Sequence, residues 1–129
     1  MNEHILVIDD EADIRELLRE VLTIKGYRVS TAADAEQAKK AVKEIPPQLI
    51  ILDFQIEQGD GFVLIDELKC LVPKIPILLL TGALFDRNGV RDTIEQRVSR
   101  YLDKTTPLST IISEIELLLV EAPAAAQQV

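Results

Sequence analysis

The sequence predicts an α/β domain in which short parallel strands alternate with amphipathic helices. Three short runs are almost wholly aliphatic, at residues 4–8, 48–52 and 75–80, as is typical of parallel strands buried on both faces. Stretches with helical periodicity separate these runs, and a fourth run at 99–103 and a weaker fifth at 27–31 complete the alternation. Parallel strands need right-handed crossover connections, so we expect helices on both faces of one doubly wound sheet.

The first two helices are predicted from the spacing of their apolar residues and from their ends. The first helix has one apolar face, with residues spaced i, i+3, i+4, i+7 and i+8: Ile14, Leu17, Leu18, Val21 and Leu22. Gly26 can terminate this helix. Asp34 can cap a second helix over residues 35–44, which stops before the Pro46-Pro47 pair.

The remaining helices follow the third, fourth and fifth strands. Apolar spacing at Phe62, Ile65 and Leu68 predicts a helix that ends before Pro73, and a weaker pattern over 88–98 predicts the next. The last helix has a capping residue, a proline at its first position and an inward apolar stripe: Thr106, Pro107, Leu108, Ile111, Ile112, Ile115 and Leu119. Residues 121–129 carry no core pattern, so we expect a domain over 1–120 and then a disordered tail or linker.

The composition indicates one globular domain. The chain has 129 residues, of which 47% are hydrophobic and 28% charged, which is enough to bury a sizeable core. Its 22 acidic and 14 basic residues leave a formal charge of −8, which argues against direct binding to nucleic acids. The single cysteine excludes an internal disulfide framework. No apolar run approaches the roughly 20 residues of a membrane span, so we expect a cytoplasmic protein.

Polar residues follow the predicted strands at one end. Asp9 and Asp10 follow the first strand, Asp53 the third, Thr81 the fourth and Lys104 the fifth. Ligands of open α/β sheets bind outside the carboxyl ends of the strands. Three carboxylates at one edge repel each other unless a cation is present, and an all-oxygen set suits Mg²⁺. A threonine hydroxyl and a lysine beside them form a cradle for a phosphoryl group, which a carboxylate can accept as the nucleophile.

Four motifs occur together and in order. They are "VIDDE" (7–11), "LIILDFQIEQGDGF" (49–62), "LLLTG" (78–82) and "YLDKTTPL" (101–108). In this combination the chain resembles the receiver domain of two-component response regulators over nearly its whole length, about residues 3–120. The resemblance implies the flavodoxin-like (βα)5 fold, a five-stranded parallel sheet of order 2-1-3-4-5.

The resemblance also implies a role for each polar residue at the strand ends. Asp53 would accept the phosphoryl group, and Asp9 and Asp10 would hold Mg²⁺ together with Asp53 and the backbone carbonyl of Gln55. The donors to the phosphoryl oxygens would be Thr81 and Lys104, and the switch aromatic that turns inward as the threonine moves would be Tyr101.

Three functions are compatible with these residues, and the first is favoured. It is a switch that accepts a phosphoryl group from a histidine kinase or histidine phosphotransfer protein. The domain would catalyse only its own phosphorylation and dephosphorylation, and would then bind a downstream protein or a second copy through the fourth helix, fifth strand and fifth helix. The alternative is a constitutive interaction module that does not use phosphorylation. An aspartate-nucleophile phosphatase is disfavoured, since such enzymes carry an aspartate two residues after the nucleophile, where this chain has Gln55.

Some residues depart from the family pattern or are expected to have no role. The departures are Glu57 in place of a frequent proline, Gly82 after the threonine, Arg97-Val98 before the fifth strand and Thr105-Thr106 between the lysine and the proline. His4 is expected to be solvated, and Cys70 to be a half-buried packing residue on the third helix.

Overall fold

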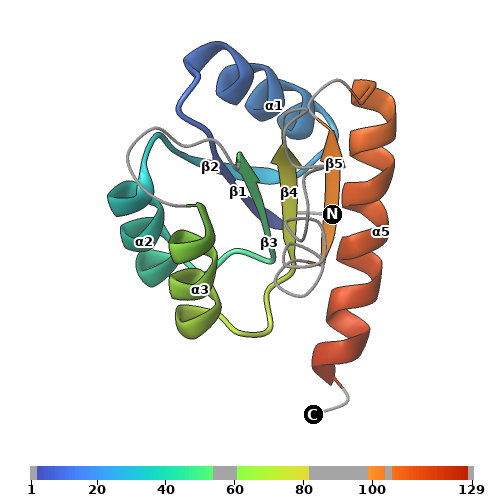
Figure 1. Ribbon diagram of the computed structural model, residues 1–129. Helices are drawn as coiled ribbons and strands as arrows, with labels where there is room; N and C mark the ends of the chain where they lie inside the picture. The colour runs from blue at the N-terminus through green and yellow to red at the C-terminus, as the bar shows by residue number, and fades with distance from the viewer. Residues whose placement is uncertain (1–2, 54–60, 82–98, 104–105, 128–129) are drawn as a thin grey trace, which may run out of the picture.

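The structure, a computed structural model, describes residues 3–53, 61–81, 99–103 and 106–127 (Figure 1). The elements in chain order are β1 His4–Ile8, α1 Ala12–Ile24, β2 Arg28–Ala32, α2 Ala35–Glu44, β3 Leu49–Asp53, α3 Gly61–Leu71, β4 Ile77–Thr81, β5 Arg100–Asp103 and α5 Leu108–Gln127. The helix predicted over 88–98 lies outside the described residues.

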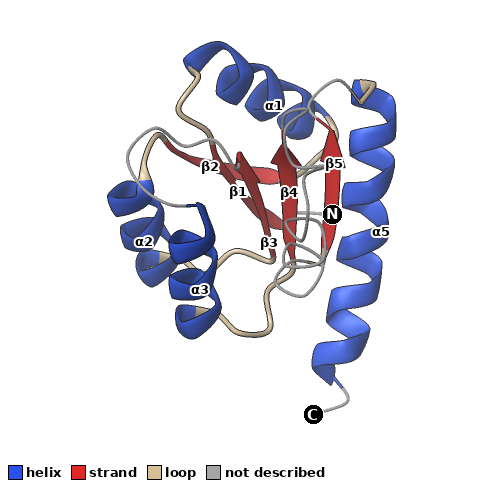
Figure 2. Cartoon of the chain, viewed as in Figure 1, coloured by secondary structure: helices blue, strands red, loops and turns tan. Residues whose placement is uncertain are grey.

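The strands form one parallel sheet of five strands in the order β2-β1-β3-β4-β5. This result confirms the predicted fold class and strand order. Figure 2 shows α2 and α3 together on one side of the sheet and α1 and α5 on the other, as right-handed crossovers require.

Two hydrophobic cores, one on each face of the sheet, explain why the strands read as unbroken apolar runs. Along β1, Leu6 and Ile8 face α2 and α3, whereas Ile5 and Val7 face α1 and α5. All four of these side chains are buried. Because successive strand residues point to opposite faces, a strand covered on both sides needs an apolar residue at every position. Each such side chain contributes about 1.5–3 kcal/mol when fully buried.

The ends of α1 and α2 follow the predicted signals. Gly26, just beyond α1, has a φ of +100°, a conformation that costs glycine little because it has no Cβ. At the start of α2, Asp34 accepts a hydrogen bond from the Gln37 N–H at 2.9 Å, and the Gln37 side chain accepts one from the Ala33 N–H at 2.8 Å. This reciprocal arrangement satisfies two backbone donors at the helix terminus.

Two expectations about single residues are wrong. His4 is not solvated: it is buried within β1, and its Nε2 lies 2.6 Å from Ser30 Oγ on the neighbouring β2. Its burial arises because β2 and the segment before β3 flank β1 on both sides. Cys70 is exposed rather than half-buried, since α3 turns Leu64, Ile65 and Leu68 toward the core and leaves Cys70 on its outer side.

The last helix continues beyond the predicted domain end. α5 extends to Gln127, through most of the stretch for which the sequence predicts a disordered tail or linker. The alanines at 124–126 have the highest intrinsic helix propensity. Within the described part of the chain, no helix combines the length and the apolar character that a membrane crossing requires.

Candidate acidic site at the strand ends

The carboxyl ends of β1, β3 and β4 meet at one edge of the sheet. Ile8 pairs in register with Leu52, so the next residues, Asp9 and Asp53, follow at the same level of adjacent strands. Asp53 in turn pairs with Leu80, which places Thr81 one residue further on. The backbone therefore brings these three predicted site residues to one edge. Lys104 and Gln55 lie outside the described residues, as do the departures at 57, 82, 97–98 and 105.

Three consecutive acids follow β1 at this end of the sheet. One carboxylate oxygen each from Asp9, Asp10 and Glu11 lies within 4.8 Å of the others. Asp9 is only 1% exposed, Asp10 is half-buried and Glu11 is exposed. The sequence predicted the two aspartates as metal ligands and missed Glu11, although it completes the acidic run in "VIDDE".

The turn between β1 and α1 is held by hydrogen bonds to Asp9. The Asp9 N–H donates to the Ala32 carbonyl at 3.1 Å, and Asp9 Oδ1 accepts from the Glu11 N–H at 2.9 Å. The Asp9 carbonyl accepts from Arg15 Nη1 at 2.6 Å. Arg15, which the sequence did not single out, thus reaches back from α1 to the end of β1. The first acid of the cluster is fixed at its N–H, its side chain and its carbonyl.

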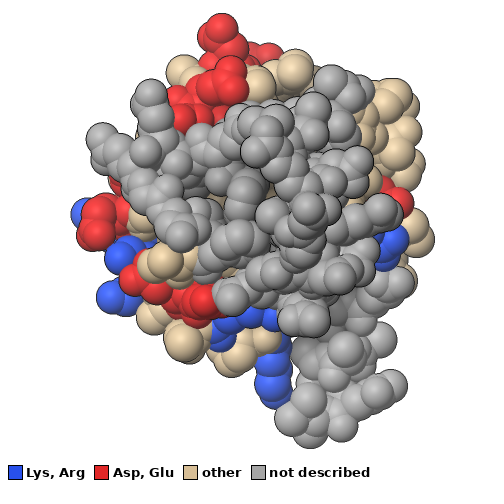
Figure 3. All heavy atoms as spheres, in the orientation of Figure 1, with Lys and Arg blue, Asp and Glu red and all other residues tan. Residues whose placement is uncertain are grey.

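The acidic cluster fits a hard divalent cation. Two unit charges about 4 Å apart repel by about 1 kcal/mol in water and about 4 kcal/mol at the effective dielectric of a protein surface. A cation removes this repulsion, and burial of Asp9 strengthens the need for one. The donors are all carboxylate oxygens, the ligand type that Mg²⁺ prefers. Figure 3 shows acidic side chains gathered at the top of the view, where α1 lies in Figure 1.

A family model described as the response regulator receiver domain matches residues 5–116. The chain belongs to this family. Receiver domains are signalling modules of two-component systems rather than conventional enzymes. They generally use Mg²⁺ at an acidic pocket, and they interact with histidine kinases and downstream effectors.

Proteins similar to this chain include named response regulators. The chain is 30% identical over 126 residues to the response regulator MprA of Mycobacterium ulcerans, which covers 92% of this chain and 51% of that protein. The receiver domain of NtrX from Brucella abortus is 30% identical, with a TM-score of 0.81 over 89% of this chain and 97% of that one. The response regulator TrrA from Thermotoga maritima, solved with Mg(2+)-BeF, is 29% identical, with a TM-score of 0.79 over 90% and 98%. The chain spans about a third to a half of the curated relatives' length.

Tyr101 of this receiver domain lies on β5, where it pairs in register with Leu79 of β4. The ring is half-buried and packs against the core on the side of α2 and α3. The predicted switch aromatic therefore lies on the strand that pairs directly with β4, and β4 ends at Thr81. Its movement remains a prediction.

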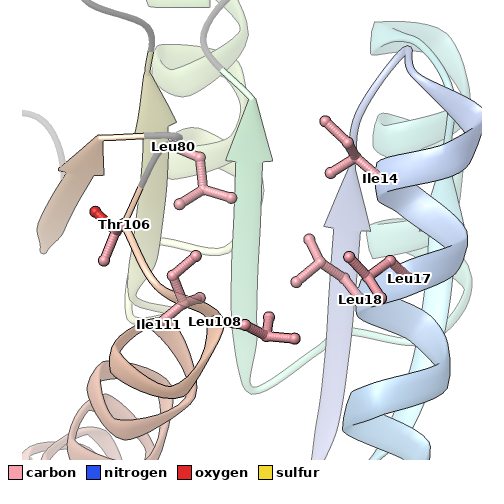
Figure 4. Close-up of a pocket in the computed structure, with 7 residues that line it drawn as sticks. All are labelled: Ile14, Leu17, Leu18, Leu80, Thr106, Leu108 and Ile111. Atoms are coloured by element: carbon pink, nitrogen blue, oxygen red, sulfur yellow. The ribbon is translucent and has the colours of Figure 1, made fainter.

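An apolar groove lies between α1 and the start of α5. It is beside the acidic edge, by which we mean the end of the sheet that carries Asp9, Asp10 and Glu11. Figure 4 shows its side chains pointing toward one another from α1, β4 and the segment that enters α5. The groove has a volume of about 160 Å³ and is lined by Ile14, Leu17, Leu18, Leu80, Thr106, Leu108 and Ile111. Leu17 is 49% exposed, so part of this apolar surface faces solvent.

Proposed function

We propose that this receiver domain is a phosphorylation-activated switch that accepts a phosphoryl group on Asp53. The supporting observation is the register between β1 and β3, which sets Asp53 beside Asp9 of the acidic cluster. The donor would be a histidine kinase or a histidine phosphotransfer protein. Membership of the receiver family supports this donor class.

The transfer requires one bond to form and one to break. An oxygen of the Asp53 carboxylate bonds to phosphorus as the bond between phosphorus and the donor's imidazole nitrogen breaks, and the imidazole takes up a proton from water. The product on Asp53 is an acyl phosphate. Asp9, Asp10, Asp53 and the carbonyl of Gln55 would hold Mg²⁺. When bound, this ion neutralises charge on the phosphoryl oxygens. The relative solved with Mg(2+)-BeF supports this assignment.

Two donors and one aromatic residue complete the proposed switch. Thr81 would donate to one phosphoryl oxygen and Lys104 would pair with another. A phosphoryl group adds about −1.5 to −2 charges, which would draw Thr81 inward and let Tyr101 rotate. The altered surface, which includes β5 and α5, would then bind a downstream protein or a second copy of the chain.

The test is phosphorylation by acetyl phosphate with Mg²⁺, followed by intact mass measurement. We expect one added phosphoryl group on the wild-type chain, removed by hydroxylamine as acyl phosphates are, and none on Asp53→Asn. Asp34→Asn is the matched control, because asparagine replaces aspartate as a helix cap at little cost. An adduct that persists in Asp53→Asn would place the acceptor elsewhere. A folded wild-type chain that takes up no phosphoryl group would favour the constitutive interaction module.

A further inference from the structure

Among the described residues, Arg15 is a cation that contacts the acidic turn. It lies near the start of α1 and is half-buried. Its Nη1 donates to the Asp9 backbone carbonyl at 2.6 Å. The carboxylate of Asp9 belongs to the same residue and lies within 4.8 Å of the carboxylates of Asp10 and Glu11. The positive charge of Arg15 therefore lies close to this group of three carboxylates.

We propose that Arg15 is a resident counter-cation of the acidic cluster and that it lowers the affinity of this edge for divalent cations. An arginine stays protonated at any physiological pH, so its charge is present whether or not a metal is bound. Without metal it offsets part of the repulsion among the carboxylates. With metal it repels the arriving cation. This inference rests on the proposed metal site and describes how that site is regulated.

The sign of the effect follows from what Arg15 touches. It contacts a backbone carbonyl rather than a carboxylate oxygen, so removing it takes away no ligand. The turn also keeps two hydrogen bonds that do not involve Arg15, from the Asp9 N–H to Ala32 and from the Glu11 N–H to Asp9 Oδ1. Loss of the positive charge should therefore outweigh loss of support for the turn, and the divalent cation should bind more tightly.

Coulomb's law gives the size of the effect. A unit charge and a divalent cation roughly 8 Å apart in a water-like medium alter a binding constant about three- to fivefold at low ionic strength. Arg19 lies one turn further along α1, where it pairs with Glu16 at 2.6 and 3.0 Å. A charge one turn, or about 5.4 Å, more distant should change the affinity about 1.6- to 2.5-fold under the same conditions. Arg19 is thus a matched control on the same helix.

The first arm of the test titrates Mg²⁺ alone into four proteins by calorimetry at low ionic strength. We expect Arg15→Gln to bind about three- to fivefold more tightly than wild type and Arg19→Gln about 1.6- to 2.5-fold more tightly. Arg15→Lys should bind as wild type does, since lysine restores the charge. The gain in Mg²⁺ affinity of Arg15→Gln over wild type should shrink in 0.5 M NaCl, because salt screens the repulsion between Arg15 and the cation. Unchanged or weaker binding by Arg15→Gln, or equal shifts for both glutamine variants, would overturn the proposal.

The second arm needs no metal and separates this inference from the proposed function. In EDTA, Arg15→Gln should lower the melting temperature of the wild-type chain more than that of an Asp10→Asn chain, because the second background has less negative charge to offset. If wild type takes up no Mg²⁺, the proposed metal site fails, while a larger loss in wild type than in the Asp10→Asn background still supports the counter-cation, and a smaller one overturns it. Equal losses would overturn it.

Discussion

Replacing Asp10 by asparagine should stabilise this domain when metal is absent. Asp10 shares a cluster with Asp9 and Glu11 whose carboxylate oxygens lie within 4.8 Å of one another. Asparagine keeps the size of the side chain and removes one negative charge. The gain arises from relief of like-charge repulsion, which the folded chain fixes at short distance and the unfolded chain relieves in part.

The distance between the carboxylate oxygens of the cluster determines how large the gain in stability should be. Two unit charges 4.8 Å apart repel by about 1 kcal/mol in a water-like medium and by about 3.5 kcal/mol at an effective dielectric of 20. Asp10 is half-buried, and Arg15 offsets part of the repulsion, so we expect the free energy of unfolding to rise by about 1–2 kcal/mol. For a domain of this size that gain corresponds to roughly 3 to 10 °C in melting temperature.

The assay is thermal unfolding with EDTA and with Mg²⁺. In EDTA, Asp10→Asn should melt above wild type. At a Mg²⁺ concentration of about 100 times its dissociation constant, wild type should gain about 2.7 kcal/mol by mass action, whereas Asp10→Asn should gain much less. The difference in melting temperature between the two proteins should therefore shrink or change sign when Mg²⁺ is added.

Asp13→Asn provides the control because it changes the net charge equally outside the cluster. Asp13 lies in the first turn of α1, where a negative charge interacts favourably with the helix dipole. Removing this charge should leave the melting temperature equal to that of wild type or slightly lower. It should keep the full response to Mg²⁺. The electrostatic reasoning is refuted if Asp10→Asn melts no higher than Asp13→Asn in EDTA.

Two further predictions concern residues away from the acidic edge. Burial lowers the pKa of His4, and the charge of Arg28 lowers it further. Because the unfolded chain then binds more protons, the free energy of unfolding should fall as the pH drops below about 6.5. His4→Gln should flatten this pH dependence in urea unfolding at pH 5 to 8, whereas parallel curves for the two proteins would contradict it. Ile51→Ala should cost about 2–5 kcal/mol because Ile51 is 1% exposed in the central strand, while the same change at Ile24, 84% exposed, should stay within about 0.5 kcal/mol; equal urea midpoints would show that the core tolerates the cavity.

The fold could be predicted from the sequence because a strand that is buried on both faces consists of an almost unbroken run of apolar residues. The runs that became β1, β3 and β4 admit almost no polar residue, and helix ends such as Asp34 and Gly26 carry their own local signals. Such signals depend on neighbours in sequence. His4 was misjudged because its burial depends on Ser30, which is distant in sequence and reaches it only when β2 pairs with β1.

The candidate site was only partly predictable for a related reason. The rule that parallel strands end at one edge brings Asp9, Asp53 and Thr81 together without knowledge of any side chain. Arg15 escapes that rule. On a helix rich in charges it reads as one more surface cation, and its contact with the Asp9 carbonyl depends on the direction of a long side chain. An arginine shortly after an acidic pair at a strand end is the signal that could have identified it.

The acidic edge and the apolar groove share the same chain segments. Leu80 lines the groove and directly precedes Thr81 on β4, and Ile14 lines it and directly precedes Arg15 on α1. Adjacent residues on a strand point to opposite faces, and packed side chains shift between discrete arrangements rather than deforming continuously. A change of charge at the acidic edge that moves the end of β4 or the first turns of α1 therefore also moves a wall of the groove. Leu17 leaves part of that groove open to solvent, so such a movement would also change the shape of an exposed apolar surface.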